Sequence, residues 1–189
     1  MKKRQFVIHP GMIEAPRVFV RAEKLLRARG HEVTYHACQS HAPEDYDPET
    51  VHIVHSGGFI CSKLLGKSQV FLIAPCTTRS HERAFFTQFG IDIKDSFVRR
   101  EWSMFWYKNL SALGELLFNF PYWNRMRVQF VRHQPPLPAS KLIILHPHDP
   151  WDKDFNWSDH TTVEVPGQHD EIVYRPERIL AVIFDKLEA

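Results

Sequence analysis

A mostly apolar run, residues 51–54, stops at a His-Ser-Gly-Gly turn, and a segment compatible with a helix, residues 60–65, follows at once. So short a run is long enough for a buried strand and too short for the core of a helix. A strand that passes through a tight turn into a helix is the unit from which parallel sheets are built. The stretch therefore predicts an α/β fold, in which the hydroxyl of Ser56 stands at the carboxyl end of a strand.

Five further runs have the length and apolar content of strands: residues 6–8, 31–36, 68–74, 141–146 and 161–165. Amphipathic helices are expected at residues 18–29, which Gly30 ends, and at residues 176–187. The first strand, the first helix and the second strand form a β-α-β unit, so the sheet begins parallel. The pattern predicts a mostly parallel sheet of about six strands with helices on both faces.

The composition is that of one compact unit, because 189 residues with 43% hydrophobic and 24% charged side chains can bury a substantial core. A formal net charge of +2 does not favour nucleic acid or an anionic membrane as the main partner. No apolar run approaches the length of a membrane span. The basic residues 2–4 are followed by too few apolar residues for a signal peptide. We therefore expect a soluble, cytoplasmic protein without a membrane span, and its oligomeric state stays open.

The cysteines, Cys38, Cys61 and Cys76, are odd in number and do not have the spacing of metal ligands. An odd number of widely separated cysteines fits a reducing compartment better than a disulfide framework. We expect each of them to be a small buried residue.

Residues 79–137 differ from the rest of the chain, because they hold 13 of its 24 aromatic residues and show no alternation of strands and helices. The segment predicts several helices, closed by the proline-rich residues 134–138. Its aromatic side chains can form the core of a helical lobe, or some of them can face a pocket. Arginines interleaved with the aromatics could suggest nucleic acid, but a solvated outer face explains them at this modest net charge.

The turn after residue 54 resembles the nucleophile elbow of the α/β-hydrolase family, whose pattern is Gly-x-Ser-x-Gly and often Gly-His-Ser-x-Gly-Gly. His55, Ser56 and Gly58 match this pattern, and Val54 stands where the family usually has a small residue. The resemblance implies an α/β-hydrolase-like fold. Its core would be residues 1–78 and 138–189, with residues 79–137 inserted as a helical cap. Judged on this stretch alone, Ser56 can also be a serine that merely caps the following helix.

The same resemblance implies a Ser-Asp-His triad in that chain order. Asp149 follows the fifth predicted strand, where the family places its acid, and Asp152 and Asp154 are nearby rivals. His169 lies in the turn after the last predicted strand, where the family places its histidine. An aspartate before proline is also a common turn residue, so Asp149 taken singly carries little weight. The agreement among Ser56, Asp149 and His169 is what supports the triad, because each follows a strand at the same edge of the sheet.

Two backbone N–H groups would hold the oxyanion if the resemblance is carried through. One comes from Gly57, and the other comes from Gly11 or Met12, because Pro10 has no N–H to donate. The loop after the first strand can also be an ordinary turn that ends the strand. Three aromatic residues of the cap are candidates for lining a substrate pocket: Trp102, Trp106 and Trp123.

The resemblance implies a serine hydrolase that cleaves a carboxylic ester or thioester with an apolar part through an acyl-enzyme. Its partner would be a small acyl substrate, with no cofactor and no metal. His146, His148 and Asp149 imitate a metal site, but no second cluster of suitable spacing supports one. The alternative is a catalytically inactive protein with a hydrolase-like fold that binds a small apolar ligand or a protein partner.

Overall fold

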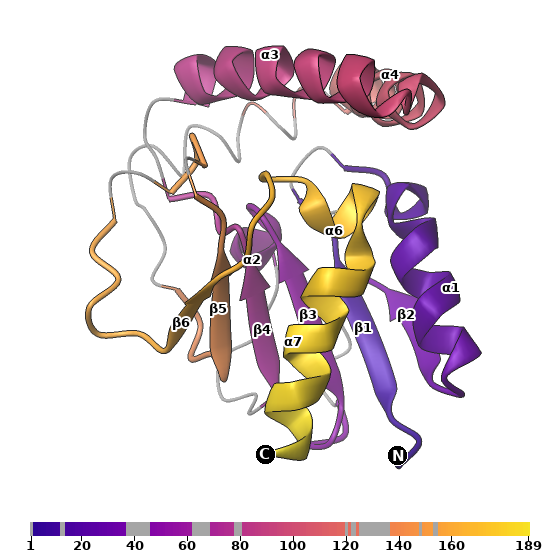
Figure 1. Cartoon of the computed structure of the whole chain (residues 1–189), viewed down its shortest axis with the longest axis vertical. Coiled ribbons are helices and arrows are strands. Elements are labelled where there is room, and N and C mark those ends of the chain that lie inside the picture. Colours follow the sequence, from indigo (N-terminus) through magenta and orange to yellow (C-terminus); the bar gives the residue numbers. More distant parts are fainter. Residues whose placement is uncertain are drawn as a thin grey trace.

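The computed structural model describes residues 2–11, 14–36, 46–61, 69–77, 81–119, 121, 124, 137–147, 149–152 and 155–189. A six-stranded sheet with the order β2-β1-β3-β4-β5-β6 forms its centre (Figure 1). The strands are β1 (Gln5–His9), β2 (Glu32–Tyr35), β3 (Val51–His55), β4 (Val70–Ile73), β5 (Leu142–Leu145) and β6 (Thr162–Glu164). Each neighbouring pair is parallel. The predicted α/β class with a parallel sheet is confirmed.

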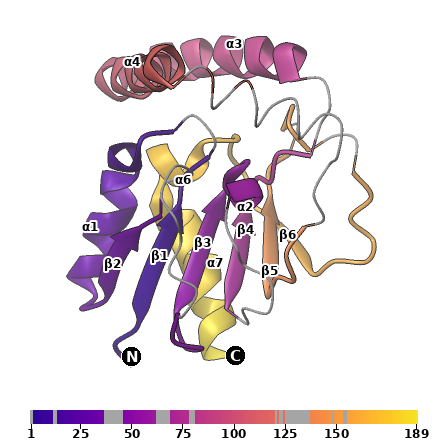
Figure 2. The ribbon, with the colours of Figure 1, turned by 180° about the vertical axis from the view of Figure 1, so that it is seen from behind.

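Helices lie on both faces of the sheet and across its carboxyl end. They are η1 (Pro16–Phe19, a 3-10 helix), α1 (Val20–Ala28), α2 (Gly58–Cys61), α3 (His81–Arg99), α4 (Trp102–Phe118), α6 (Glu171–Tyr174) and α7 (Pro176–Glu188). The helices α1, α6 and α7 cover one face, and α2 lies on the other (Figures 1 and 2). The short helix α6 was not expected from the sequence. None of the described helices is long and apolar enough to cross a bilayer.

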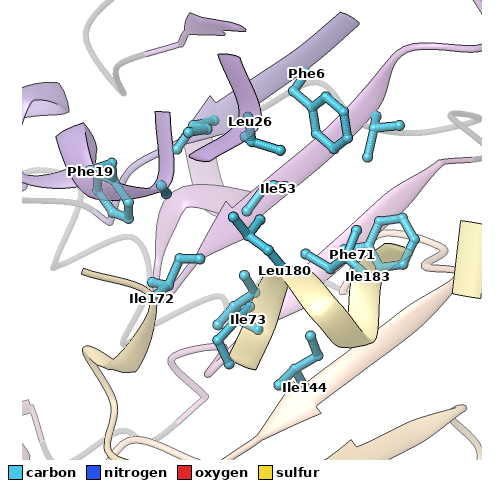
Figure 3. Packing of buried hydrophobic residues seen from close by; sticks show 14 of the residues in the cluster. Phe6, Phe19, Leu26, Ile53, Phe71, Ile73, Ile144, Ile172, Leu180 and Ile183 are labelled. Carbon is cyan, nitrogen blue, oxygen red and sulfur yellow. The ribbon is translucent and has the colours of Figure 1, made fainter. Parts of the chain in front are cut away.

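The larger part of the core lies between the sheet and the helices α1, α6 and α7. Alternate residues of each strand point toward this layer, as the two-residue period of a strand requires. Figure 3 shows how side chains of the central strands, such as Ile53 and Ile73, pack against Leu26, Leu180 and Ile183 from the helices. Each fully buried side chain of this size contributes about 1.5–3 kcal/mol to folding. This layer therefore holds the strands in register.

A smaller apolar cluster lies on the other face of the sheet. It contains Val54, Phe59, Val70, Leu72, Cys76, Ile143 and Leu145. Val54 is fully packed in it, so its β-branched side chain is accommodated beneath the turn that follows. Cys76 is buried as expected, and burial raises the pKa of its thiol. Cys38 and the side chain of Cys61 lie outside the described part of the chain.

The helices α3 and α4 fall within the segment predicted to be helical, and they lie over the carboxyl ends of the strands (Figures 1 and 2). The orientation of α3 is the reverse of an ordinary amphipathic helix. Its buried stripe is mainly polar and consists of Ala84, Gln88, Asp92 and Ser96. Five of its large apolar side chains, Phe86, Phe89, Ile93, Phe97 and Val98, are exposed. Among the described side chains of α3, the face turned away from solvent is therefore mainly polar.

The loop after β1 and the turn after β3 are in close contact, because β1 and β3 are adjacent and in register, with His9 opposite Val54. The chain runs from β1 to β2 on one side of it and then continues to β3 on its other side, so the strand order reverses at β1, the point at which parallel sheets open a site. A Cβ atom on Gly58 would lie 2.6 Å from the carbonyl oxygen of Pro10. Only glycine fits at that contact.

We predict that Gly58→Ala destabilises the protein by about 1–3 kcal/mol, because its methyl group would meet backbone atoms that cannot rotate away. Gly90→Ala in α3 is the matched control. Its added Cβ would have no heavy atom within 4 Å, and alanine favours a helix by up to about 1 kcal/mol over glycine. Urea unfolding of both variants measures the difference. Equal stability of Gly58→Ala and the wild type would contradict the close contact described here.

Candidate functional site

Ser56 stands in a strained turn between β3 and α2. Its φ is 49°, in the left-handed region that residues other than glycine rarely adopt. Its N–H donates to the carbonyl of Ile73 at 3.0 Å, which fixes the turn to the end of β4. Strain of this kind costs about 1–3 kcal/mol and persists only where the surrounding structure holds it. The strand, the sharp turn and the start of a helix expected from the sequence are thus present.

His169 joins Ser56 to Asp149. The Ser56 Oγ lies 2.8 Å from Nε2 of His169, and Nδ1 of the same ring lies 2.8 Å from Oδ2 of Asp149. Because a carboxylate only accepts hydrogen bonds, Nδ1–H donates to Asp149, and Nε2 is left to accept from the serine hydroxyl. His169 and Asp149 are buried, while Ser56 is partly accessible. This arrangement lets the imidazole withdraw the hydroxyl proton.

Asp149 is held by its own loop. Its Oδ1 accepts the N–H of Trp151 at 2.8 Å, so its two carboxylate oxygens have separate partners. The Trp151 ring lies 5.5 Å from that of His169. Of the two rivals for the acid, Asp152 lies in the following turn, and Asp154 is outside the described residues. The structure thus brings Asp149 to His169.

His55, next to Ser56, is fully buried and makes two strong contacts. Its Nδ1–H donates to Oε2 of Glu14 at 2.7 Å, and its Nε2–H donates to the carbonyl of His169 at 2.9 Å. Oδ1 of Asp170 lies 4.0 Å from the same Nε2. Burial by itself would lower the pKa of His55, but the charge and hydrogen bond of Glu14, followed by the charge of Asp170, raise it to about 9. His55 is therefore an imidazolium ion at neutral pH.

Glu14 also accepts a hydrogen bond from one of the N–H groups predicted to hold the oxyanion. The N–H of Gly11 donates to Oε2 of Glu14 at 2.6 Å, and a Cβ on Gly11 would lie 3.2 Å from Cβ of Ser56. Gly11 is thus beside the serine as expected, but its N–H is already bound. Gly11 could supply an oxyanion donor only after its N–H leaves Glu14, so this assignment stays a prediction. Met12 lies outside the described residues, and Gly57 is buried beside Ser56.

Two of the tryptophans predicted to line a pocket, Trp102 and Trp106, are side chains of α4. Trp102 is 37% exposed and Trp106 is 56% exposed, and both contact Phe105 on α4. Aromatic content alone cannot tell which face of a helix carries its rings, and here these two rings are on the accessible side. Trp123 lies outside the described residues.

His146, directly after β5, links two strand ends. Its Nδ1–H donates to the carbonyl of Val165 at 2.8 Å, and burial lowers its pKa. A neutral, buried His146 thus helps to place the loops that carry Asp149 and His169. His148 is outside the described residues, so the metal-like run expected around it is not described in full.

Among the described residues, His55, His169 and Asp170 bring potential metal ligands within 4.8 Å of one another. A metal ligand must offer a lone pair, so a histidine has to be neutral to bind a metal. Both nitrogens of His55 donate hydrogen bonds, and Nε2 of His169 faces Ser56. Hydrogen bonding accounts for this group without a metal.

Comparison with protein-family models and with curated proteins gives no match. The resemblance to α/β-hydrolases therefore depends on the motif and on the geometry described above.

Sequence reasoning gave no role to Glu14, Asp170 and Lys108, and it named His55 only as part of the serine motif. Position was a signal for His55 and Asp170, because His55 precedes Ser56 and Asp170 follows His169. The contacts of Glu14 with His55 and of Lys108 with Asp170 carry no local signal, since these partners are far apart along the chain.

We predict that stability falls as pH rises from about 6.5 to about 9, because a group whose folded pKa is raised loses its contribution as it deprotonates in the folded state. His55, with a pKa of about 9 against a reference of 6.5, accounts for on the order of 3 kcal/mol. Urea unfolding at both pH values measures the change, and His55→Gln should remove most of it.

His160→Gln is the control, because it removes a histidine that packs against Phe155 and Trp157 instead. It should keep the wild-type dependence on pH. The same pH dependence in His55→Gln and in the wild type would show that His55 is not charged in the folded protein.

Proposed function

We propose that the protein is a serine hydrolase that cleaves a carboxylic ester or thioester through Ser56, His169 and Asp149. The observation that carries this proposal is the pair of 2.8 Å contacts that joins the serine hydroxyl, both ring nitrogens of the histidine and a buried carboxylate. A serine that only caps a helix needs neither a histidine nor an acid behind it. Three side chains from three separate loops are aligned here, as acyl transfer requires.

In the proposed reaction, Oγ of Ser56 attacks the carbonyl carbon of the substrate while Nε2 of His169 takes the hydroxyl proton. Asp149 holds the ring in the tautomer that leaves Nε2 free to accept, and it stabilises the imidazolium that forms. His169 then gives the proton to the leaving alcohol or thiol. A water molecule, activated by the same ring, hydrolyses the acyl-enzyme and restores Ser56.

The oxyanion formed by the attack needs N–H donors that are not already bound. Gly57, directly after Ser56, is the first candidate. Gly11 can serve only if its bond to Glu14 is broken, so the second donor is assigned to Met12 in this proposal. The loop after β1 would then help to hold the oxyanion, and the closeness of Gly11 to Ser56 supports this role.

We further propose that residues 79–137, including α3 and α4, act as a cap and that the acyl part of the substrate is apolar. The position of both helices over the carboxyl end of the sheet supports the first part (Figure 1). The concentration of aromatic residues in this segment supports the second part. Because the buried stripe of α3 is mainly polar, contacts with an apolar acyl group are assigned in this proposal to other parts of the cap.

Binding without turnover is the competing proposal, and the outer surface of α3 and α4 favours it. Large apolar side chains are exposed there along both helices, among them Phe97 at 73%, Leu117 at 69% and Phe118 at 86%. An extended apolar surface of this kind is typical of sites that bind another molecule. Such a protein would not need an activated serine.

A fluorophosphonate probe should label the protein at Ser56, because the neighbouring histidine makes this hydroxyl nucleophilic. Ser56→Ala should abolish labelling while its unfolding curve shows that the fold is retained. Mass spectrometry of the labelled peptide identifies the site. Equal labelling of wild type and Ser56→Ala would exclude Ser56 as the nucleophile and favour binding without turnover.

Asp149→Asn should lower the turnover of a simple aryl ester by about three to four orders of magnitude. The asparagine can still accept the N–H of Trp151, so the loop should hold, but its amide group would face Nδ1 and favour the wrong tautomer of His169. Asp152→Asn is the matched control and should stay within about twofold of the wild type. The reverse order would mean that the acid is wrongly assigned.

A further inference from the structure

Lys108 of α4 is a buried cation held between two carboxylates. Its Nζ lies 2.7 Å from Oδ2 of Asp92 on α3, and it also contacts Oδ2 of Asp170. Gln88 of α3 donates to Oδ1 of Asp92 at 2.7 Å and to Oδ2 of Asp170 at 3.4 Å. The side chain of Lys108 is only 12% exposed, and those of both acids are almost fully buried. The two helices therefore meet the loop after β6 through charged groups.

The three charges depend on one another. Burial by itself would lower the pKa of Lys108, but the charges of Asp170 and Asp92 raise it above its usual range. Burial would likewise raise the pKa of Asp170, and the charge of Lys108, followed by that of His55, lowers it below its usual range. Removing one partner would leave a buried charge uncompensated, which costs far more than losing an exposed pair.

Asp170 is also next to the candidate triad. It directly follows His169, and its Oδ1 faces Nε2 of His55, the nitrogen that donates to the carbonyl of His169. His55 in turn directly precedes Ser56. The carboxylate that receives Lys108 is therefore one residue from the histidine, and the ring that it faces is one residue from the serine.

A second ion pair, between the start of α4 and the helix α1 on the sheet, differs from the Lys108 group in its exposure to solvent. Arg21 of α1 contacts Glu101, the residue before α4, at 3.1 Å. Their side chains are 39% and 24% exposed, and an accessible pair of this kind is worth only about 0–1 kcal/mol. Neither residue is adjacent in sequence to Ser56 or His169. Of these two described contacts, the buried group around Lys108 is therefore the one through which α4 can affect the site.

We propose that Lys108 is a positioning residue that couples the seating of α3 and α4 to the alignment of His169 with Ser56. When the helices are seated, Lys108 compensates Asp170, and the loop that carries His169 is held against His55. When they separate from the body, Asp170 loses its cation, and this loop is free to relax. The part of the inference that concerns turnover rests on the hydrolase proposed above.

The test compares Lys108→Met with Lys94→Met, an exposed lysine on α3. Lys108→Met should slow fluorophosphonate labelling of Ser56 by about 10- to 100-fold, because a small displacement of His169 is enough for that loss. Lys94→Met should stay within about twofold. Lys108→Arg keeps the cation and should recover most of the rate.

A readout independent of activity is the low-field proton resonance of the Nδ1–H of His169, which reports its bond to Asp149. Lys108→Met should shift or broaden this resonance and should speed hydrogen exchange in α4. Faster exchange with an unchanged resonance and an unchanged labelling rate would overturn the inference, because Lys108 would then only stabilise the helices.

If Lys108→Met does not fold, variants of the two aspartates that contact Lys108 test the inference instead. Asp170→Asn and Asp92→Asn each remove a buried carboxylate from the same lysine, but only Asp170 adjoins His169. The resonance of His169 should change much more in Asp170→Asn, and equal effects would overturn the inference. If the wild type is not labelled at all, the proposed hydrolase fails, while the resonance and the exchange of α4 still decide whether Lys108 couples the helices to His169.

Discussion

The parallel pairing of neighbouring strands from β1 to β6 is the constraint on which the candidate site depends. In a parallel sheet every strand ends at the same edge, so the residues that follow these strands are brought together although they are far apart along the chain. Gly11, Ser56, Asp149 and His169 all lie within five residues after the end of a strand. The core between the sheet and α7 fixes the register, and the register fixes the distances among these residues.

The second constraint is electrostatic. Between the sheet edge and the helices above it lie Glu14, His55, Asp170, Lys108 and Asp92, alternating in charge and largely excluded from water. Each member is adjacent to another of opposite sign, so each depends on its neighbours to remain charged. A group of this kind is expensive to bury, and it is better suited to fixing one arrangement than to adding stability.

The sheet and the places of the three candidate triad residues could be predicted from the sequence, because strands and turns are specified locally. Short β-branched runs indicate strands, and a residue just past a strand is assigned to the sheet edge whatever happens elsewhere. The contacts of Lys108 and Glu14 could not be predicted, since Lys108 meets a partner 62 positions away and Glu14 one 41 positions away. The orientation of α3 was also beyond local rules, which place the apolar stripe of a helix toward the body.

That orientation affects how the structure responds to temperature. If α3 separated from the sheet, the groups newly exposed to water among its described side chains would be mainly Gln88, Asp92 and Ser96, because Phe86, Phe89, Ile93, Phe97 and Val98 are already exposed. Hydration of apolar surface raises the heat capacity of a transition, and hydration of polar surface lowers it. The separation of α3 would then carry a small or negative heat-capacity change, whereas global unfolding carries a large positive one. Cooling weakens the hydrophobic stabilisation of the core. It would not weaken the packing of α3 on the sheet in the same way.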